Sequence, residues 1–393
     1  MSRAAQLIRR GRLVAVPTET VYGLAGNGLD ESAVKEIYEV KGRPEVKPLS
    51  LMVPGAEAME LYCEDVPRQA KALAERFWPG PLTIVLKAKD SVPQIVRAGG
   101  DTVGLRCPDH ELTLETLRLA GVPFAAPSAN PSGAPSPKSA GEVMGYFDGQ
   151  IAAVIDGGDC GIGRESTIID MSAEPYRILR HGALSEEDIA AALAEKLCVI
   201  GITGGTGCGK TTALMELEKQ GALVIDCDAL YHELLERDRP MIDELAAEFP
   251  SAVSGGTVDR KALGGIVFKD AAALERLNAI THRHVDRALT ELLRQHAMAG
   301  GKIAAIDAIE LISSGVNKRC ATVIGITANR ENRIQRIMDR DGISREYAEM
   351  RVDAQKPDSY FEENCDYVVK NNSGQAEFIN SFNRLIQEVL KNG

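Results

Sequence analysis

The chain of 393 residues has none of the patterns that place a protein in a membrane or outside the cell. No apolar run approaches the ~20 residues that a helix needs to cross a bilayer. Arg3, Arg9, Arg10 and Arg12 interrupt the start of the chain, so we expect no signal peptide. The eight cysteines form no C-x-x-C pair and no Cys/His run, which argues against a zinc site or a disulfide framework. We therefore expect reduced thiols, a cytoplasmic location and no membrane partner.

The chain also lacks an excess of positive charge, because acidic residues outnumber basic ones and the net charge is −11. Proteins dedicated to nucleic acids or anionic membranes usually carry a basic surface, so this balance argues against both classes. The sequence contains no internal repeat and no low-complexity tract. Apolar residues make up 44% and charged residues 26%, as in ordinary globular proteins. The length suits two or three domains of ~100–200 residues each.

Short apolar runs alternate with helical patterns along the chain, which predicts an α/β architecture. In the first half we expect strands over residues 13–16, 49–53, 82–86, 103–105, 123–126, 151–155 and 167–169, and helices over 31–40, 67–76 and 111–120. In the second half we expect strands over 197–202, 222–225, 303–306 and 322–326, and helices over 212–218, 331–339 and 345–355. This spacing favours a parallel sheet flanked by helices in the second half.

The boundary between the halves falls near Lys196. Residues 185–188 read S-E-E-D, which matches the capping pattern that opens a helix, here expected to end at about Lys196. A strand candidate follows at once, with no Gly/Ser-rich or Pro-rich spacer. We therefore predict one domain over residues 1–196 and a second over residues 197–393.

A phosphate-binding loop opens the second domain. Residues 204–211 read G-G-T-G-C-G-K-T, a complete G-x-x-x-x-G-K-[ST] motif between a strand and a helix. In this motif backbone N–H groups cradle phosphate oxygens, the lysine reaches the β- and γ-phosphates and the last hydroxyl helps to hold Mg²⁺. We predict that ATP contacts Gly204, Gly205, Gly207, Cys208, Gly209, Lys210, Thr211 and Thr212, with Lys210 also catalytic and Thr211 also at the metal. A Gly-rich structural turn is the alternative.

Two acids, Asp226 and Asp228, end the next strand candidate, at the position where ligands of open α/β sheets bind. One carboxylate could accept the proton of an attacking hydroxyl, while the other supports Mg²⁺ through water. We assign Asp228, which lies further into the loop, as the base and Asp226 to the metal. The alternative is that both acids only cap the helix expected from Ala229.

Four arginines recur along one predicted helix: Arg330, Arg333, Arg336 and Arg340. Their spacing of three and four residues puts the last three on one face. A row of guanidinium groups beside the loop could clamp phosphate charge in the transition state. The row could equally pair with acids of the same helix as a solvated face.

These features, taken in order, resemble dephospho-coenzyme A kinases over about residues 197–393. The resemblance rests on the phosphate loop, Asp226-Cys227-Asp228, Asp259-Arg260, Thr281-His282, the segment with Arg336 and Arg340, and Gln355. It implies transfer of the γ-phosphate of ATP to the ribose 3′-hydroxyl of dephospho-CoA, with Asp228 as the base. It also implies that Arg336 and Arg340 contact ATP, and that Arg260 and His282 contribute to the acceptor side. Residues 308–312 read A-I-E-L-I, where the family usually has Pro-Leu-Leu-Phe-Glu.

Polar clusters take the place of a phosphate loop in the first half. They read P-T-E-T-V-Y-G-L at residues 17–24, K-G-R-P at 41–44 and P-S-A-N at 127–130. Lys41 and Arg43 place two cations within three residues, enough to neutralise part of a triphosphate. An ordinary pair of surface charges is the alternative.

In their order, these clusters resemble the YrdC-like threonylcarbamoyl-AMP synthases over about residues 1–190. The likeness extends to W-P-G-P-L-T at 78–83, G-L-R at 104–106, S-T-I-I-D at 166–170 and L-R-H-G at 179–182. It implies an open, twisted mixed sheet with helices around a deep basic concavity. It also implies that L-threonine, bicarbonate or CO₂, and ATP yield threonylcarbamoyl-adenylate and pyrophosphate, in the service of the threonylcarbamoyl-adenosine of tRNA.

The same resemblance implies roles for individual residues of the first half. Lys41, Arg43 and Arg180 would offset phosphate charge while Mg²⁺ bridges the oxygens. Threonine would be held by Thr18 and Arg106 with Thr167 nearby, and the nucleotide would be contacted by Ser128, Asn130 and Ser136. We expect no side-chain nucleophile, because threonine supplies the attacking group and catalysis rests on positioning and charge.

The leading hypothesis is a bifunctional enzyme with two separate Mg²⁺-ATP sites that serves tRNA through other modification proteins. One alternative makes the first half a noncatalytic RNA-binding or regulatory module. Another keeps a kinase in the second half but gives it a nucleoside or another small alcohol as acceptor.

Overall fold

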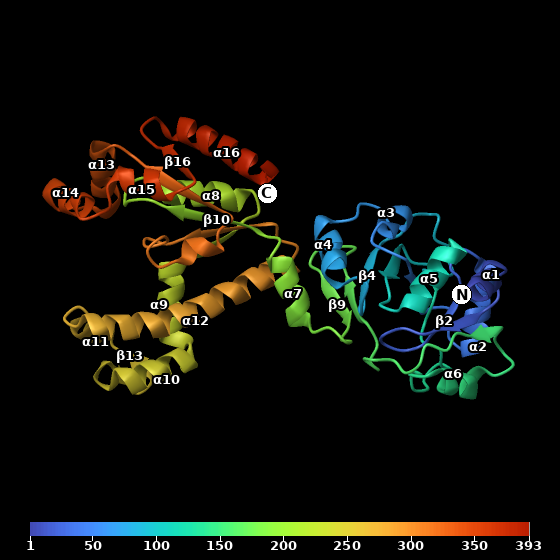
Figure 1. The fold of residues 1–393 in the computed structure, drawn as a ribbon. Coiled ribbons are helices and arrows are strands. Elements are labelled where there is room, and N and C mark those ends of the chain that lie inside the picture. Colours follow the sequence, from blue (N-terminus) through green and yellow to red (C-terminus); the bar gives the residue numbers. More distant parts are fainter. Residues whose placement is uncertain (393) are drawn as a thin grey trace. The chain divides into compact units, whose positions relative to one another are not determined.

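The computed structural model describes residues 1–392 and folds them as two units, each with its own main sheet (Figure 1). Unit 1 comprises Met1–Lys196 with Met298–Gly300, and unit 2 comprises Leu197–Ala297 with the chain from Gly301 onward. Gly393, the last residue of the predicted second domain, lies outside the described residues. The Ser185 hydroxyl accepts a hydrogen bond from the N–H of Asp188 and caps the last helix of unit 1, as its sequence predicts.

Among the described residues, the strands of unit 1 form one mixed sheet in the order β7-β1-β2-β6-β3-β5-β4-β8-β9. These strands are β1 (Val14–Val16), β2 (Gly23–Asn27), β3 (Ser50–Met52), β4 (Leu82–Lys87), β5 (Thr102–Arg106), β6 (Phe124–Ala125), β7 (Ala153–Val154), β8 (Thr167–Asp170) and β9 (Arg177–Arg180). The pairs β1–β7, β3–β5 and β4–β8 are parallel and the others antiparallel, which confirms the mixed sheet. The sequence did not predict β2, because G-L-A-G-N has the composition of a turn.

Helices cover this sheet: α1 (Ser2–Arg9), α2 (Glu31–Lys41), α3 (Ala58–Tyr62), α4 (Arg68–Phe77), α5 (Glu111–Ala120), α6 (Ala140–Phe147) and α7 (Glu186–Ala194). Ile8 of α1 and Leu117 of α5 join Val16 and Phe124 of the sheet in one hydrophobic core. The carboxylate of Asp30 caps α2, and Gly42 ends it in a left-handed conformation. This helix therefore delivers Lys41, its last residue, to a fixed point beside the polar clusters.

Unit 2 contains a parallel sheet in the order β11-β14-β10-β15-β16, as its spacing predicts. Its strands are β10 (Cys198–Thr203), β11 (Leu223–Asp226), β14 (Ile303–Asp307), β15 (Thr322–Thr327) and β16 (Tyr367–Lys370). Asp226 at the end of β11 is the register partner of Asp307 at the end of β14. Two carboxylates therefore share the edge of the sheet from which the phosphate loop departs.

Helices of unit 2 fall into two groups. The first comprises α8 (Lys210–Lys219), α13 (Arg330–Asp341), α14 (Arg345–Asp353), α15 (Asp358–Asn364) and α16 (Gln375–Asn392). Leu217 of α8 and Phe382 of α16 lie in the sheet core, whereas Ile334 of α13 and Ala348 of α14 belong to a small core of their own. The second has a separate core and comprises α9 (Cys227–Arg237), α10 (Arg239–Glu248), α11 (Arg260–Val267) and α12 (Ala271–Met298), with the hairpin of β12 (Val253–Ser254) and β13 (Thr257–Val258). Within residues 1–392, no helix is long and apolar enough to cross a membrane.

Candidate active sites

A cavity opens on the sheet of unit 1, with ≈ 780 Å³ of empty space that includes open solvent. Six strands of the sheet contribute lining residues: Gly23, Ser50, Met52, Thr83, Arg106, Ile168 and Arg180. Loops contribute Arg43, Ser128, Glu165 and Ser166 among others. Of the residues predicted for the first half, Arg43, Arg106, Ser128 and Arg180 line this cavity.

The guanidinium groups in this cavity are held from behind. Arg180 donates from Nε to the carbonyl of Ser166 at 2.9 Å and from Nη2 to the Ser166 hydroxyl at 3.0 Å. The Ser166 hydroxyl is also 2.8 Å from that of Thr83. Burial lowers the pKa of Arg180, yet a guanidinium stays charged at any ordinary pH. Arg43 donates to the carbonyl of Pro48 at 3.1 Å, so these cations are oriented before a ligand arrives.

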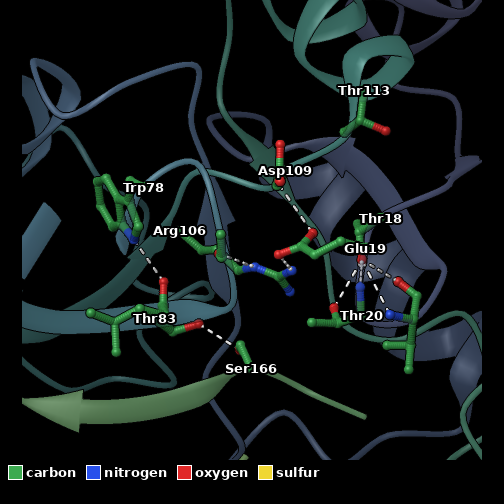
Figure 2. A network of polar contacts seen from close by, with 12 residues as sticks. Thr18, Glu19, Thr20, Trp78, Thr83, Arg106, Asp109, Thr113 and Ser166 are labelled. Atoms are coloured by element: carbon green, nitrogen blue, oxygen red, sulfur yellow. Dashed lines mark hydrogen bonds and ion pairs between the residues drawn. The ribbon is translucent and has the colours of Figure 1, made fainter. Parts of the chain in front are cut away.

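A buried ion pair joins Arg106, which lines the cavity, to Glu19 (Figure 2). Arg106 is 6% exposed, and its Nη2 lies 2.7 Å from Oε1 of Glu19. The other Glu19 oxygen accepts the backbone N–H of Asp109 at 3.1 Å, and Arg106 also donates to the carbonyl of Gly80 at 3.3 Å. Glu19 belongs to the P-T-E-T motif, but nothing in the local sequence pairs it with Arg106, so its role could not be predicted.

Lys41 lies beneath the loop of residues 127–136 and does not line the cavity. It is 3% exposed, and its ammonium donates to the carbonyls of Ser128 and Asn130. Burial, with a smaller contribution from Arg43, lowers the pKa of Lys41 to about 8. The structure therefore uses this cation to hold the P-S-A-N loop in place.

The polar side chains predicted to contact substrates are engaged within the protein. Three hydroxyls donate internally: Thr18 to the carbonyl of Val21 at 2.7 Å, Thr167 to that of Leu184 at 2.6 Å, and Ser136 to the Glu165 carboxylate at 2.6 Å. Asn130 donates to the carbonyl of Ala134 at 2.7 Å, while its Oδ1 is buried with no partner among the described residues. The bond from Ser136 lowers the pKa of Glu165, so a charged carboxylate faces the cavity, for which the family resemblance implied a basic lining.

The phosphate loop of unit 2 joins β10 to α8, which begins at Lys210. Gly204 has a φ of +145°, and a Cβ there would lie 2.2 Å from the carbonyl oxygen of Ile326. Gly209 has a φ of +105°, so no other residue suits either position well. The Lys210 ammonium donates to the carbonyl of Gly204 at 3.1 Å and thus arches back over the loop. Thr211 is exposed in the first turn of α8.

Side chains from α13 and from segments further along the chain hold the outside of this loop. Arg333, 5% exposed, donates to the carbonyl of Thr206 at 3.1 Å and to the side chain of Gln355. Arg336 donates to the carbonyl of Gly207 at 3.2 Å, and Asn371 donates to that of Cys208 at 2.8 Å. Gln355 also bonds the N–H and the hydroxyl of Thr206. Sequence reasoning assigned no role to Asn371, which follows the unpredicted strand β16.

The structure gives the four arginines of the row different partners. Arg333 and Arg336 lie on the loop, whereas Arg330 pairs with Asp353 at 2.8 Å. Arg340 pairs with Asp341 at 2.7 Å and makes no hydrogen bond to the loop among the described residues. The predicted set of Arg336 and Arg340 is thus only half assembled here, because a neighbouring carboxylate holds the second guanidinium.

Three carboxylates gather at the ends of β11 and β14. Asp226 caps α9, with one oxygen accepting the N–H groups of Asp228 and Ala229 at 2.9 Å each, so the capping alternative applies to this residue. Asp228 is exposed in the first turn of α9. Asp307, which was not predicted as a site residue, has a buried oxygen with no partner among the described residues. Burial raises the pKa of Asp307 to about 6; Lys210 opposes this shift, and Asp226 and Asp228 add to it.

The two residues predicted for the acceptor side differ in their surroundings. Arg260, the first residue of α11, lies 3.1 Å from Nε2 of His232 on α9. His282 is exposed on α12 and makes no hydrogen bond or ion pair in the part of the chain that the structure describes. The structure therefore links Arg260, but not His282, to the helix that carries Asp228.

Comparison with protein families matches each half separately. The Sua5/yciO/yrdC model, described as Telomere recombination, matches residues 6–182, and the CoaE model, described as Dephospho-CoA kinase, matches residues 198–377. A threonylcarbamoyl-AMP synthase of Pyrococcus abyssi is 50% identical over 192 residues, which cover 49% of this chain and 56% of that protein. The chain therefore spans little more than half the length of this relative. A shorter relative from Mycobacterium tuberculosis is 35% identical, with 48% of this chain and 87% of that protein covered.

The second half has relatives of its own. A dephospho-CoA kinase of Geobacter sulfurreducens is 37% identical over 194 residues, which cover 49% of this chain and 96% of that protein.

Among solved structures, P. abyssi Sua5 complexed with L-threonine is 30% identical with a TM-score of 0.48, covering 83% of this chain and 96% of that chain.

Proposed function

The chain belongs to the threonylcarbamoyl-AMP synthase family through residues 6–182 and to the dephospho-CoA kinase family through residues 198–377, and we propose that it carries out both reactions. Residues 1–196 would form threonylcarbamoyl-adenylate from L-threonine, bicarbonate or CO₂, and ATP. Residues 197–393 would transfer the γ-phosphate of ATP to the 3′-hydroxyl of dephospho-CoA. The observation that carries this proposal is that each unit has its own site: a cavity with three guanidinium groups in unit 1 and a braced phosphate loop in unit 2.

In the synthase site, the carbamate oxygen of carboxylated threonine attacks the α-phosphorus of ATP, and the bond from that phosphorus to pyrophosphate breaks. Arg43 and Arg180 offset the charge of the phosphates, which develops further as pyrophosphate leaves. Arg106 receives the threonine carboxylate, and Ser128 contacts the nucleotide. Lys41 acts as a positioning residue, because its ammonium holds the backbone of the loop that carries Ser128. Asn130 and Ser136 shape the same loop through their internal hydrogen bonds, whereas Thr18 holds Val21 and Thr167 holds Leu184 in the same way.

In the kinase site, the oxygen of the acceptor hydroxyl bonds to the γ-phosphorus of ATP while Asp228 accepts the proton of that hydroxyl. The bond from the γ-phosphorus to ADP breaks, and ADP leaves. Arg333, Arg336 and Asn371 hold carbonyl groups of the loop, which favours presentation of its N–H groups to phosphate. Lys210 moves from the carbonyl of Gly204 to the phosphates. Arg340 would join them by exchanging Asp341 for phosphate oxygens.

The donors at the sheet edge fit Mg²⁺. No three His, Cys, Asp or Glu side chains within residues 1–392 are placed to hold a metal by themselves, which suits an ion that takes one or two carboxylates together with substrate phosphates. Thr211, Asp226 and the unpartnered oxygen of Asp307 would hold it. When bound, the ion neutralises charge on the β- and γ-phosphates.

An ATP turnover assay on the full chain tests both reactions. We expect pyrophosphate release that requires both L-threonine and bicarbonate, and ADP release that requires dephospho-CoA. Lys210→Ala should lower the kinase rate by about 100-fold or more, and Arg43→Ala should impair the synthase alone, because each removes a cation from one site. A folded variant that loses both activities would contradict the independence of the sites. If the folded chain phosphorylates dephospho-CoA but shows no pyrophosphate release that depends on L-threonine and bicarbonate, the first half would instead be a regulatory module.

A further inference from the structure

An arginine in the helical part of unit 2 contacts an imidazole instead of a carboxylate. Arg260 Nη2 lies 3.1 Å from Nε2 of His232, and among the described residues Arg260 forms no ion pair. Other arginines of the same group of helices do pair with acids: Arg237 with Glu233, Arg276 with Glu248, Arg283 with Glu244 and Arg287 with Asp238. In a chain of net charge −11, this exposed guanidinium therefore keeps its charge available.

The chemistry of the contact defines the state of His232. A guanidinium only donates hydrogen bonds, so Nε2 must accept and the proton must sit on Nδ1. That Nδ1 is buried and has no partner in the described part of the chain. The ring is consequently held by Arg260 alone, although Tyr231 lies close to it at 5.5 Å between ring centroids. Such a ring can change partner when an anion takes over the guanidinium.

The pair lies on the same helix face as the proposed base. His232 follows Asp228 by four residues of α9, which places the two on one face and about 6 Å apart along the axis. In dephospho-CoA the diphosphate is attached to the 5′ carbon of the ribose whose 3′-hydroxyl reacts. A ribose spans a distance comparable to one helical turn. A hydroxyl placed at Asp228 therefore brings the 5′-diphosphate to the neighbourhood of His232 and Arg260.

We propose that His232 and Arg260 form the subsite for the 5′-diphosphate of the acceptor, an inference that rests on the kinase reaction proposed above. Arg260 supplies permanent charge, and His232 adds a second polar group beside it. The pair positions the acceptor and selects nucleotides that carry a 5′-diphosphate ester over plain nucleosides. His232 is here a specificity residue and takes no part in proton transfer at the 3′-hydroxyl.

The rival explanation is that the contact only ties α9 to α11. The two explanations differ in the effect of replacing the imidazole by a cation. His232→Arg would place two guanidinium groups together and break a purely structural contact, whereas an anion subsite would gain a permanent donor. They differ also for adenosine, which lacks the diphosphate. Loss of a diphosphate subsite leaves the kinetics with adenosine unchanged, whereas loss of a structural contact impairs both acceptors.

The test is steady-state kinetics of the full chain with dephospho-CoA and with adenosine as acceptors. Since hydrogen bonds to charged groups change affinity by about tenfold or more, we expect Arg260→Gln to raise the KM for dephospho-CoA about 10–100-fold and His232→Ala about 5–20-fold. We expect kcat to stay within about twofold, and kcat/KM for adenosine to stay unchanged. His232→Arg should keep the KM for dephospho-CoA within about threefold of wild type. Arg237→Gln, on the same helix as His232, is the matched control and should change the KM for neither acceptor.

Each outcome decides the matter. An unchanged KM in both Arg260→Gln and His232→Ala overturns the subsite while leaving the kinase assignment intact. An equal fall in kcat/KM for dephospho-CoA and for adenosine shows a structural contact and also overturns the subsite. A His232→Arg variant with a higher KM for dephospho-CoA than His232→Ala does the same. A wild-type chain that does not phosphorylate dephospho-CoA overturns the kinase reaction and the subsite with it.

Discussion

The phosphate loop offers the sharpest prediction, because its Gly204 is constrained in two ways at once. Its φ of +145° disfavours a side chain, at a cost of about 1–3 kcal/mol. A Cβ would also lie 2.2 Å from the carbonyl oxygen of Ile326. Ile326 belongs to β15, which is paired with β10 on one side and with β16 on the other, so its backbone cannot move away cheaply. We expect Gly204→Ala to destabilise unit 2 by about 3 kcal/mol or more and to abolish the kinase.

Two other glycines of unit 2 separate the contributions. In Gly209→Ala the φ is again positive, but the new Cβ meets the side chain of Asn371 at 2.3 Å instead of backbone. We expect a loss of about 2 kcal/mol, made up of strain and the Asn371 hydrogen bond. Gly265→Ala is the control, because nothing lies within 4 Å of a Cβ at that position in α11. That variant should gain about 0.5–1 kcal/mol.

Urea unfolding can follow the two units separately. The single tryptophan, Trp78, belongs to unit 1, whereas circular dichroism reports helices of both units. At a typical slope of about 1–3 kcal/mol per molar urea, Gly204→Ala should lower the midpoint of the unit 2 transition by about 1–3 M. The fluorescence midpoint should stay in place. The prediction for Gly204 is wrong if Gly204→Ala unfolds unit 2 at the same urea concentration as Gly265→Ala, or if it retains normal kinase activity.

Two further predictions concern unit 1, both read by Trp78 fluorescence during unfolding. Burial lowers the pKa of Lys41 from 10.5 to about 8, so its charge opposes folding below pH 8 and this penalty fades between pH 8 and 10.5. Wild type should gain at most roughly 3 kcal/mol over that range, and Lys41→Met should lose this gain; parallel pH profiles would contradict it. Glu19→Gln leaves Arg106 buried without a counter-charge and should cost about 3 kcal/mol. Saturating L-threonine should stabilise this variant more than wild type, and an equal effect on both would argue against threonine at Arg106.

Features that depend on consecutive residues were accessible from the sequence. The phosphate loop, the cap at Ser185 and the strand that ends in Asp226 each combine residues within one turn or one strand. Their backbone geometry follows from local chemistry, such as glycine at a positive φ or a hydroxyl that accepts a nearby N–H. The alternation of apolar runs and helices likewise predicted a parallel sheet in unit 2.

Features that depend on partners far apart in the sequence required the tertiary structure. Spacing alone groups Arg333 with Arg340, yet Arg333 braces the carbonyl of Thr206, which is 127 positions away in the sequence. Strand order placed Asp307 beside Asp226, across 81 positions of sequence, and helix packing brought Arg260 to His232. The reason is physical: a charged side chain takes its role from the partner that burial leaves within reach, and sheet register and helix packing choose that partner.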